Sequence, residues 1–199
     1  MIFGDRVTPR YVLRDLLSRE AVERYAEDRG WDLVAGQDAD PEAGTEYERI
    51  WLTDTTLTLH YVEDRVARYA YVFLAGDDLE AVERIVPDLM RVLEPWTPAE
   101  LLDGVRKAAP GPDRGRAVLR AAIGAPLDFD QEFFDCVRSA LEHPEPPMRE
   151  IGILATSYAA WPRYRPPLEA IARDDPDAEV REMAQAALRA FDRGGVTSR

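Results

Sequence analysis

Few side chains in this 199-residue sequence are of the types that catalyse reactions or bind metals. The chain has two histidines, His60 and His143, and one cysteine, Cys136. A zinc site needs three or four converging ligands, so these three residues could complete one only with carboxylates. His60 falls on the polar face of an expected strand, His143 in an expected turn, and Cys136 among apolar residues. We therefore expect a solvated strand histidine, a turn histidine, a buried thiol, no metal, no cofactor and no catalytic residue.

The motifs that usually mark nucleotide or acyl chemistry are missing. We find no phosphate-binding or dinucleotide-binding glycine pattern and no nucleophile elbow. Asp38, Asp40 and Glu42 have some likeness to a calcium loop, but the full ligand spacing and the central glycine are missing. We interpret residues 36–45 as an exposed acidic loop. The same three carboxylates are a second candidate surface for binding a protein.

The first candidate surface is the segment from Tyr158 to Pro167, which is rich in Trp, Tyr and Arg. These residue types are enriched at interaction hot spots. The alternative is that the aromatic rings fill the space between packed helices and that the arginines are merely exposed. The candidate binding residues in this segment are Tyr158, Trp161, Arg163, Tyr164 and Arg165.

The first half of the chain has the pattern of helices packed on an antiparallel sheet. Thr8-Pro9 is typical of a helix start, and this first helix is expected to end near Gly30. Strands are expected near 31–34, 47–53, 55–62 and 66–74, because apolar and polar residues alternate and the links are short. Gly76-Asp77-Asp78 precedes a further helix, which Pro87 should kink or divide. We predict an α+β domain over residues 1–96.

From Trp96 onward the pattern is helical only. Helices are expected near 98–109, 114–123, 130–142, 147–160, 165–174 and 178–192, with a disordered tail over 194–199. Residues 143–150 align with 175–182 at an offset of 32 residues, and Pro112 and Arg116 suggest a degenerate earlier copy. Core positions align behind them: Met148, Ile151, Ala155 and Ala159 with Val180, Met183, Ala187 and Phe191.

This second half resembles short bacterial HEAT-like helical repeats, of the armadillo type, over about residues 97–193. The residues that carry the resemblance are Asp175, Pro176, Val180, Arg181, Ala184, Ala187 and Leu188. The resemblance implies a solenoid of about three helix pairs, in which a turn Asp and a following Arg form a structural ladder between repeats. Carried over, the ladder residues are Asp175 and Arg181, with Arg149 as the middle counterpart. The turn before Arg149 has His143 where the pattern has Asp.

Charge limits the classes of partner. The chain has 25 Lys and Arg against 38 Asp and Glu, a formal charge of −13. Residues 1–96 hold 11 arginines and 21 acidic residues, so this part carries most of the negative charge. Such a surface repels nucleic acids and anionic membranes and favours a basic protein partner. No stretch is apolar enough to span a membrane, and we expect a cytoplasmic protein of undetermined oligomeric state.

These observations favour a non-catalytic protein-binding module. A helical-repeat surface would contact the partner, and the acidic first half would speed the encounter with a basic protein, as in immunity proteins or chaperones. The order of elements in the first half also loosely resembles small α+β secretion-chaperone folds. The alternative is an enzyme or small-ligand-binding protein that uses a pocket of carboxylate, Tyr and Arg side chains between the two domains.

Overall fold

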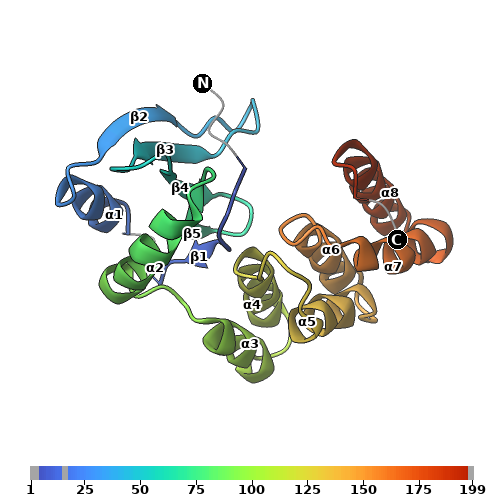
Figure 1. Cartoon of the computed structure of the whole chain (residues 1–199). Helices are drawn as coiled ribbons and strands as arrows, with labels where there is room; N and C mark the ends of the chain where they lie inside the picture. The colour runs from blue at the N-terminus through green and yellow to red at the C-terminus, as the bar shows by residue number, and fades with distance from the viewer. Residues whose placement is uncertain (1–4, 15–17, 197–199) are drawn as a thin grey trace. The chain divides into compact units, whose positions relative to one another are not determined.

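The computed structural model describes residues 5–14 and 18–196. The chain has an α+β fold with a helical second part, and it divides into two compact units, residues 1–97 and 98–199. The division between the units coincides with the change from mixed to purely helical patterning at Trp96 (Figure 1).

The first unit is built on an antiparallel sheet with strand order β1-β5-β4-β3-β2. Its strands are β1 (Tyr11–Val12), β2 (Asp32–Gln37), β3 (Tyr47–Leu52), β4 (Thr58–Asp64) and β5 (Tyr69–Ala75). Strands β2 to β5 form a meander, since each pairs with the next along the chain, and β1 adds to the free edge of β5. The predicted strands are thus present, with an additional short one at the edge.

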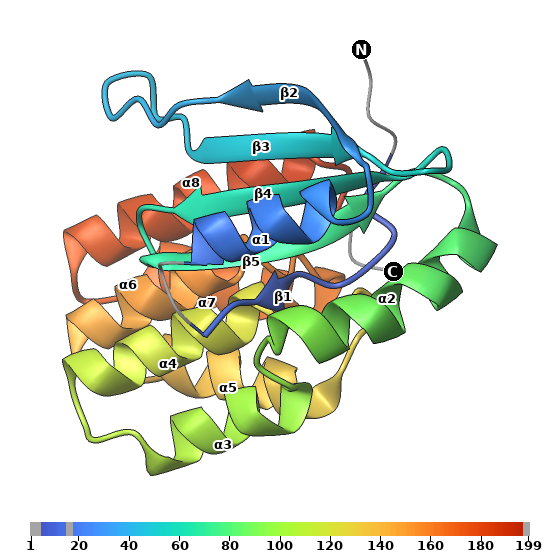
Figure 2. The same ribbon diagram turned by 90° about the vertical axis from the view of Figure 1, so that its left-hand side faces the viewer.

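Helix α1 (Ser18–Glu27) lies in front of one face of this sheet, at β4 and β5, in Figure 2, and α2 (Leu79–Leu93) shares the same apolar core. That face carries the alternating residues Leu57, Leu59 and Tyr61, which are wholly buried. They form one apolar core with residues of both helices, among them Tyr25 and Ile85. Alternation with a period of two therefore identified one buried face, but the strand is not half-buried as predicted, because Thr58 and His60 on the opposite face are buried as well.

The expected start of the first helix is wrong. The chain at Tyr11–Val12 is a strand, and Thr8 does not cap a helix: its buried hydroxyl accepts a hydrogen bond from the amide of Leu74 on β5. Residues 15–17 of the expected helix lie outside the described residues. Pro87 does not divide α2, which is a single helix over 15 residues. Asp78 does cap this helix, accepting from the amide of Ala81.

The second unit consists of three helical hairpins. They are α3 (Pro98–Lys107) with α4 (Pro112–Ile123), α5 (Gln131–Leu141) with α6 (Pro146–Ala155), and α7 (Arg165–Asp174) with α8 (Ala178–Arg193). A short 3-10 helix, η1 (Pro162–Tyr164), precedes α7. Within the unit, α4, α6 and α8 pack in one layer, and α3, α5 and α7 follow one another in a second (Figure 1).

Of the core positions that the repeat pattern predicted, five are buried and two, Ile151 and Ala187, are half-buried; the buried ones are Met148, Ala155, Ala159, Val180 and Phe191. Met183 is an exception, since it is 36% exposed and does not belong to the core. Residues 194–196 are not a free tail, because the amide of Val196 donates to the carbonyl of Phe191. Residues 197–199 of the predicted tail lie outside the described residues.

Candidate functional site

The aromatic segment before α7 meets the loop between α4 and α5. The indole Nε1 of Trp161 donates to the carbonyl oxygen of Leu127 at 3.2 Å. The ring of Phe129 meets the edge of the Trp161 ring with a centroid separation of 5.3 Å. Two loops that are 34 residues apart in sequence are therefore held together by one tryptophan.

Behind this contact the rings continue into the interior. Trp161 stacks on Tyr164 at 5.8 Å, and Tyr164 stacks on Phe134 of α5 at 5.0 Å. Trp161 is 6% exposed and Tyr164 is fully buried. Burial raises the pKa of Tyr164, so its phenol stays neutral at any ordinary pH. Two of the five predicted binding residues in this segment are thus core residues, because their rings fill the space between the second and third hairpins.

The outer layer of the same cluster is exposed. The guanidinium of Arg163 lies 4.1 Å above the centre of the Phe129 ring, a cation–π contact. Phe129 is 37% exposed and Leu127 40% exposed. We call Leu127, Phe129 and Arg163 the aromatic–arginine patch. The sequence did signal its two apolar members, as large side chains in a loop between helices, but our sequence analysis missed them.

The other two predicted binding residues of the segment, Tyr158 and Arg165, do not belong to this patch. Tyr158 is half-buried. Arg165 donates to the carboxylate of Asp192 at 2.7 Å and to the carbonyl oxygen of Val196 at 2.8 Å. Arg165 therefore anchors the end of α8 and is not part of the aromatic–arginine patch.

The acidic loop joins β2 and β3. Asp38 accepts from the guanidinium of Arg49 at 2.8 Å. Asp40 accepts from the amides of Glu42 and Ala43, which closes the tip of the hairpin. Glu42 itself is exposed. Two of the three predicted acidic binding residues thus have intramolecular partners, and no group of three or more His, Cys, Asp or Glu in the described chain could hold a metal ion.

The three predicted ladder residues lie close together. Arg149 at the start of α6 donates Nε and Nη2 to the two carboxylate oxygens of Asp175, in the turn of the following hairpin. Its Nη1 donates to the carbonyl oxygens of His143 and Pro144 in its own turn. Arg181 makes the corresponding contact with the carbonyl oxygen of Asp175. Hydrogen bonds from Arg149 lower the pKa of Asp175, so this carboxylate stays ionised.

One polar pocket in the first unit has the residue types expected of a ligand site. It has a volume of about 280 Å³ and is lined by Tyr25, Arg29 and Asp88 among others. However, these three side chains bind one another: Asp88 accepts from both the guanidinium of Arg29 and the hydroxyl of Tyr25. Burial raises the pKa of Tyr25 to about 12, and hydrogen bonds from Arg29 lower that of Asp88. The cluster fastens α1 to α2.

The two histidines and the cysteine differ in how well they were predicted. His60 is not solvated: it is 6% exposed, and its Nδ1 lies 2.9 Å from the carboxylate of Glu48. Its ring stacks on Phe73, so neighbouring strands cover it. His143 lies in a turn, as expected, and its Nδ1 accepts from the amide of Glu145. Burial raises the pKa of the Cys136 thiol to about 11, which leaves it a weak nucleophile at neutral pH.

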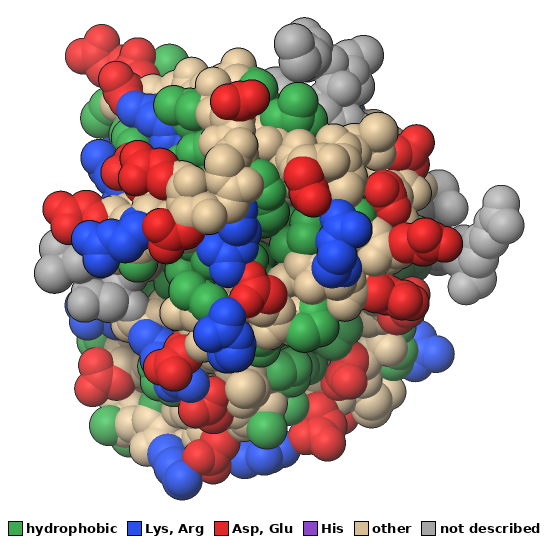
Figure 3. Space-filling view, turned by 60° about the vertical axis from the view of Figure 1, so that its left-hand side comes forward, with side chains coloured by type: hydrophobic (Ala, Val, Ile, Leu, Met, Phe, Trp, Pro, Cys, Tyr) green, Lys and Arg blue, Asp and Glu red, His purple; other side chains and the backbone are tan. Residues whose placement is uncertain are grey.

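The charge pattern does not single out another site on the face shown in Figure 3. Acidic and basic side chains alternate over the face shown in Figure 3, without one large patch of a single sign. No helix in the described part of the chain is both long and apolar enough to cross a membrane. Comparison of the chain with protein-family models, curated proteins and solved structures finds no match. The likeness to HEAT-like repeats stays a prediction.

Proposed function

We propose that this protein is a non-catalytic protein-binding module whose contact surface includes the aromatic–arginine patch. The observation that carries the proposal is the exposed Phe129 ring, held between the guanidinium of Arg163 and the buried Trp161. Aromatic and arginine side chains in a fixed position are typical of interaction hot spots. A preorganised patch also loses little conformational entropy when a partner binds.

The packing beneath the patch supports this role. Phe129 also contacts Phe134 at 5.6 Å, and Trp161 holds the loop of Leu127 by a hydrogen bond. The loop is therefore fixed by the half-buried ring of Phe134 and the buried ring of Trp161. Large apolar side chains that stay exposed on a well-packed loop are more typical of a contact surface than of a stability element.

The net charge of −13 favours a basic partner. Because the excess of acidic residues lies mainly before residue 97, the first unit would raise the rate of encounter, while the patch would hold the partner. Immunity proteins and chaperones for basic partners are examples of this class. Retention of such a partner should weaken with rising salt, since screening acts on the charge contribution.

The test is affinity capture with the full chain from lysate of the native host. The patch variant combines Phe129→Ser with Arg163→Glu. The matched control combines Leu79→Ser with Arg173→Glu, since Leu79 and Arg173 are also exposed but lie in α2 and α7. We expect a basic protein that wild type and control retain and that the patch variant loses. The same proteins retained by all three chains, or only acidic proteins retained, would contradict the proposal.

A further inference from the structure

Successive hairpins of the second unit leave two grooves that correspond to each other. The first groove lies against α5, and its α5 wall consists of Glu132, Asp135, Cys136 and Ser139. The second groove lies against α7, and its α7 wall consists of Pro167, Ala170, Ile171 and Asp174. Every residue of the second wall is 35 positions after its counterpart in the first. The two grooves therefore occupy the same place in consecutive repeats.

An arginine lines each groove, again at an offset of 35: Arg114 in the first and Arg149 in the second. Both donate to the carbonyl oxygen six residues earlier, Arg114 to Ala108 at 3.3 Å and Arg149 to His143 at 3.0 Å. These matching contacts identify Arg114, and not Arg116, as the counterpart of Arg149 in the first repeat.

The two arginines differ in what else they bind. Arg149 holds the carboxylate of Asp175 through Nε and Nη2, at 2.7 and 2.8 Å. The turn residue that corresponds to Asp175 in the preceding hairpin is His143, which accepts from the amide of Glu145 as Asp175 accepts from that of Asp177 but has no carboxylate. The Nε of Arg114 is buried and has no hydrogen-bond partner within the described residues. A buried donor without a partner is costly, so this nitrogen favours an acceptor from elsewhere.

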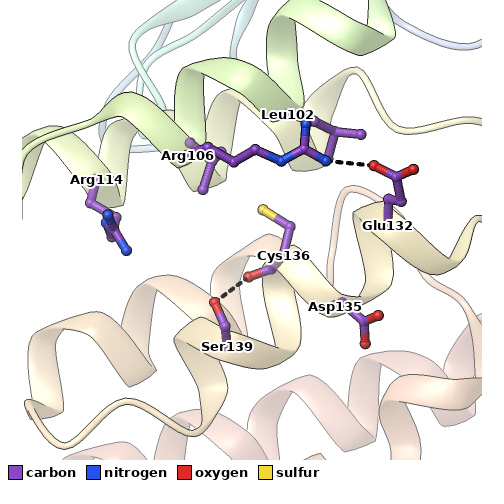
Figure 4. A pocket seen from close by; sticks show the side chains of 8 residues that line it. Leu102, Arg106, Arg114, Glu132, Asp135, Cys136 and Ser139 are labelled. Carbon is purple, nitrogen blue, oxygen red and sulfur yellow. Dashed lines mark hydrogen bonds and ion pairs between the residues drawn. The ribbon is translucent and has the colours of Figure 1, made fainter.

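The acidic residues of the first groove are next to other arginines. Glu132 accepts from Arg106 at 2.6 Å, and Asp135 lies 3.0 Å from Arg138. In Figure 4, the contact between the guanidinium of Arg106 and Glu132 lies on the opposite side of the Cys136 side chain from Arg114. The end of the groove at Arg114 thus carries a positive charge that these two carboxylates do not neutralise.

We propose that the first groove binds a carboxylate, which accepts from the guanidinium of Arg114 at Nε, the nitrogen without a partner, while Nη2 keeps its contact with Ala108. The groove has a volume of about 570 Å³, against about 300 Å³ for the second, so it has room for a small ligand. Leu102 and Val105 add apolar surface to it, which suits a ligand with a short hydrocarbon part. This inference is independent of the proposed protein-binding function, because none of its residues belongs to the aromatic–arginine patch.

Cys136 provides the readout, since it is the only thiol of the chain and lines this groove. A ligand in the groove should slow the reaction of Cys136 with a neutral maleimide. Two probes distinguish the source of the carboxylate: succinate, as a free acid, and a short amidated peptide with one internal glutamate. Potassium chloride at equal ionic strength is the control for screening. We expect saturable protection by at least one probe, and protection by neither would overturn the proposal.

Three variants test the role of Arg114. Arg114→Gln removes the guanidinium, and Ser139→Glu places a competing carboxylate on the groove wall without changing Arg114. Arg116→Gln is the matched control, because Arg116 is an exposed arginine of the same helix that does not line the groove. We expect the apparent Kd of the protecting probe to rise about 10- to 100-fold in the first two variants and to stay unchanged in the control.

Thermal unfolding of each variant shows that the fold is intact before protection is compared. If Arg114→Gln does not fold, Ser139→Glu still tests whether the carboxylate binds in this groove, since Ser139 is exposed and its substitution leaves the core unchanged. Unchanged affinity in a folded Arg114→Gln or Ser139→Glu chain would overturn the assignment. An equal loss in Arg116→Gln would do the same, because it would show a general charge effect.

Discussion

Arg149 of α6 and Asp175 of the following hairpin share two parallel hydrogen bonds, and both side chains are almost fully withdrawn from solvent. A bidentate guanidinium–carboxylate pair is among the strongest polar contacts in proteins. It joins two consecutive hairpins that otherwise meet mainly through apolar side chains. The pair is therefore the clearest polar link within the second unit.

Replacing Asp175 with Ala should destabilise the second unit by about 3–5 kcal/mol, because it leaves the Arg149 charge buried without its partner. The free energy of unfolding, from urea titrations followed by far-UV circular dichroism, measures this. Asp174→Ala is the control, since Asp174 is the exposed neighbour and pairs with Arg173. A loss below about 1 kcal/mol in Asp175→Ala would show that water replaces the carboxylate.

The same pair predicts a dependence on pH. Hydrogen bonds from Arg149 lower the pKa of Asp175 in the folded chain. A group with a depressed folded pKa adds stability above its unfolded pKa, and this stability is lost as pH falls through the folded pKa. The stability difference between wild type and Asp175→Asn should therefore be constant near neutral pH and shrink below about pH 4. A difference that grows on acidification would contradict this.

Trp161 and Phe129 touch each other but should respond differently to truncation. Trp161 is buried, so Trp161→Ala should cost about 3–5 kcal/mol of unfolding free energy. Phe129 is partly exposed, so Phe129→Ala should cost only about 1 kcal/mol. Thermal and urea unfolding of the two variants tests the distinction between supporting core and exposed patch. Equal losses would place Phe129 in the core and weaken its assignment to a binding surface.

Cys136 should react slowly in the folded chain. With the thiol pKa raised to about 11 by burial, the thiolate fraction at pH 8 is about 100-fold lower than in an unfolded chain. The rate of modification by a neutral maleimide should rise with pH up to about 11, and the chain in urea should react at the rate of a free thiol. A rate that levels off near pH 8 would show an ordinary thiol.

Two helical glycines should have opposite sensitivities. A Cβ at Gly152 would lie 2.6 Å from the backbone nitrogen of Leu141, so Gly152→Ala must push α5 and α6 apart. A Cβ at Gly104 would meet only the flexible end of Arg120. We expect Gly152→Ala to lose about 2 kcal/mol or more, and Gly104→Ala to stay neutral or gain up to about 1 kcal/mol. Unfolding midpoints in urea provide the comparison.

Local patterns were sufficient for most of the fold. The capping signal at Asp78, the alternation around Leu59 and the helical spacing after Trp96 each reflect contacts within a few residues. Thr8-Pro9 was misleading because it has the residue types of a helix start, whereas pairing with β5 places it beside a strand. His60 was misjudged for the same reason: strand alternation gives the face of a residue but not the partners that cover it.

The candidate site depended more on contacts between distant residues. We predicted Trp161, Arg163 and Tyr164 together as binding residues because they are neighbours in the chain, but only packing shows which of them stay exposed. Phe129 joins Arg163 through a loop that no local pattern connects to it. The alternative of a ligand pocket between the two units stays a prediction.

The turn between α5 and α6 has a consequence for how such repeats could diversify. Glu145, the residue before α6, lies nine positions after Cys136, whereas Asp177, the residue before α8, lies only six positions after the counterpart Ile171. The shorter turn places Asp175 against Arg149 of the preceding hairpin. The longer turn has His143 at the equivalent position, where it accepts from the amide of Glu145. The Nε of Arg114 in the hairpin before it has no partner among the described residues. The identity of one turn residue, aspartate or histidine, thus decides whether the arginine of the preceding hairpin finds a carboxylate within the chain.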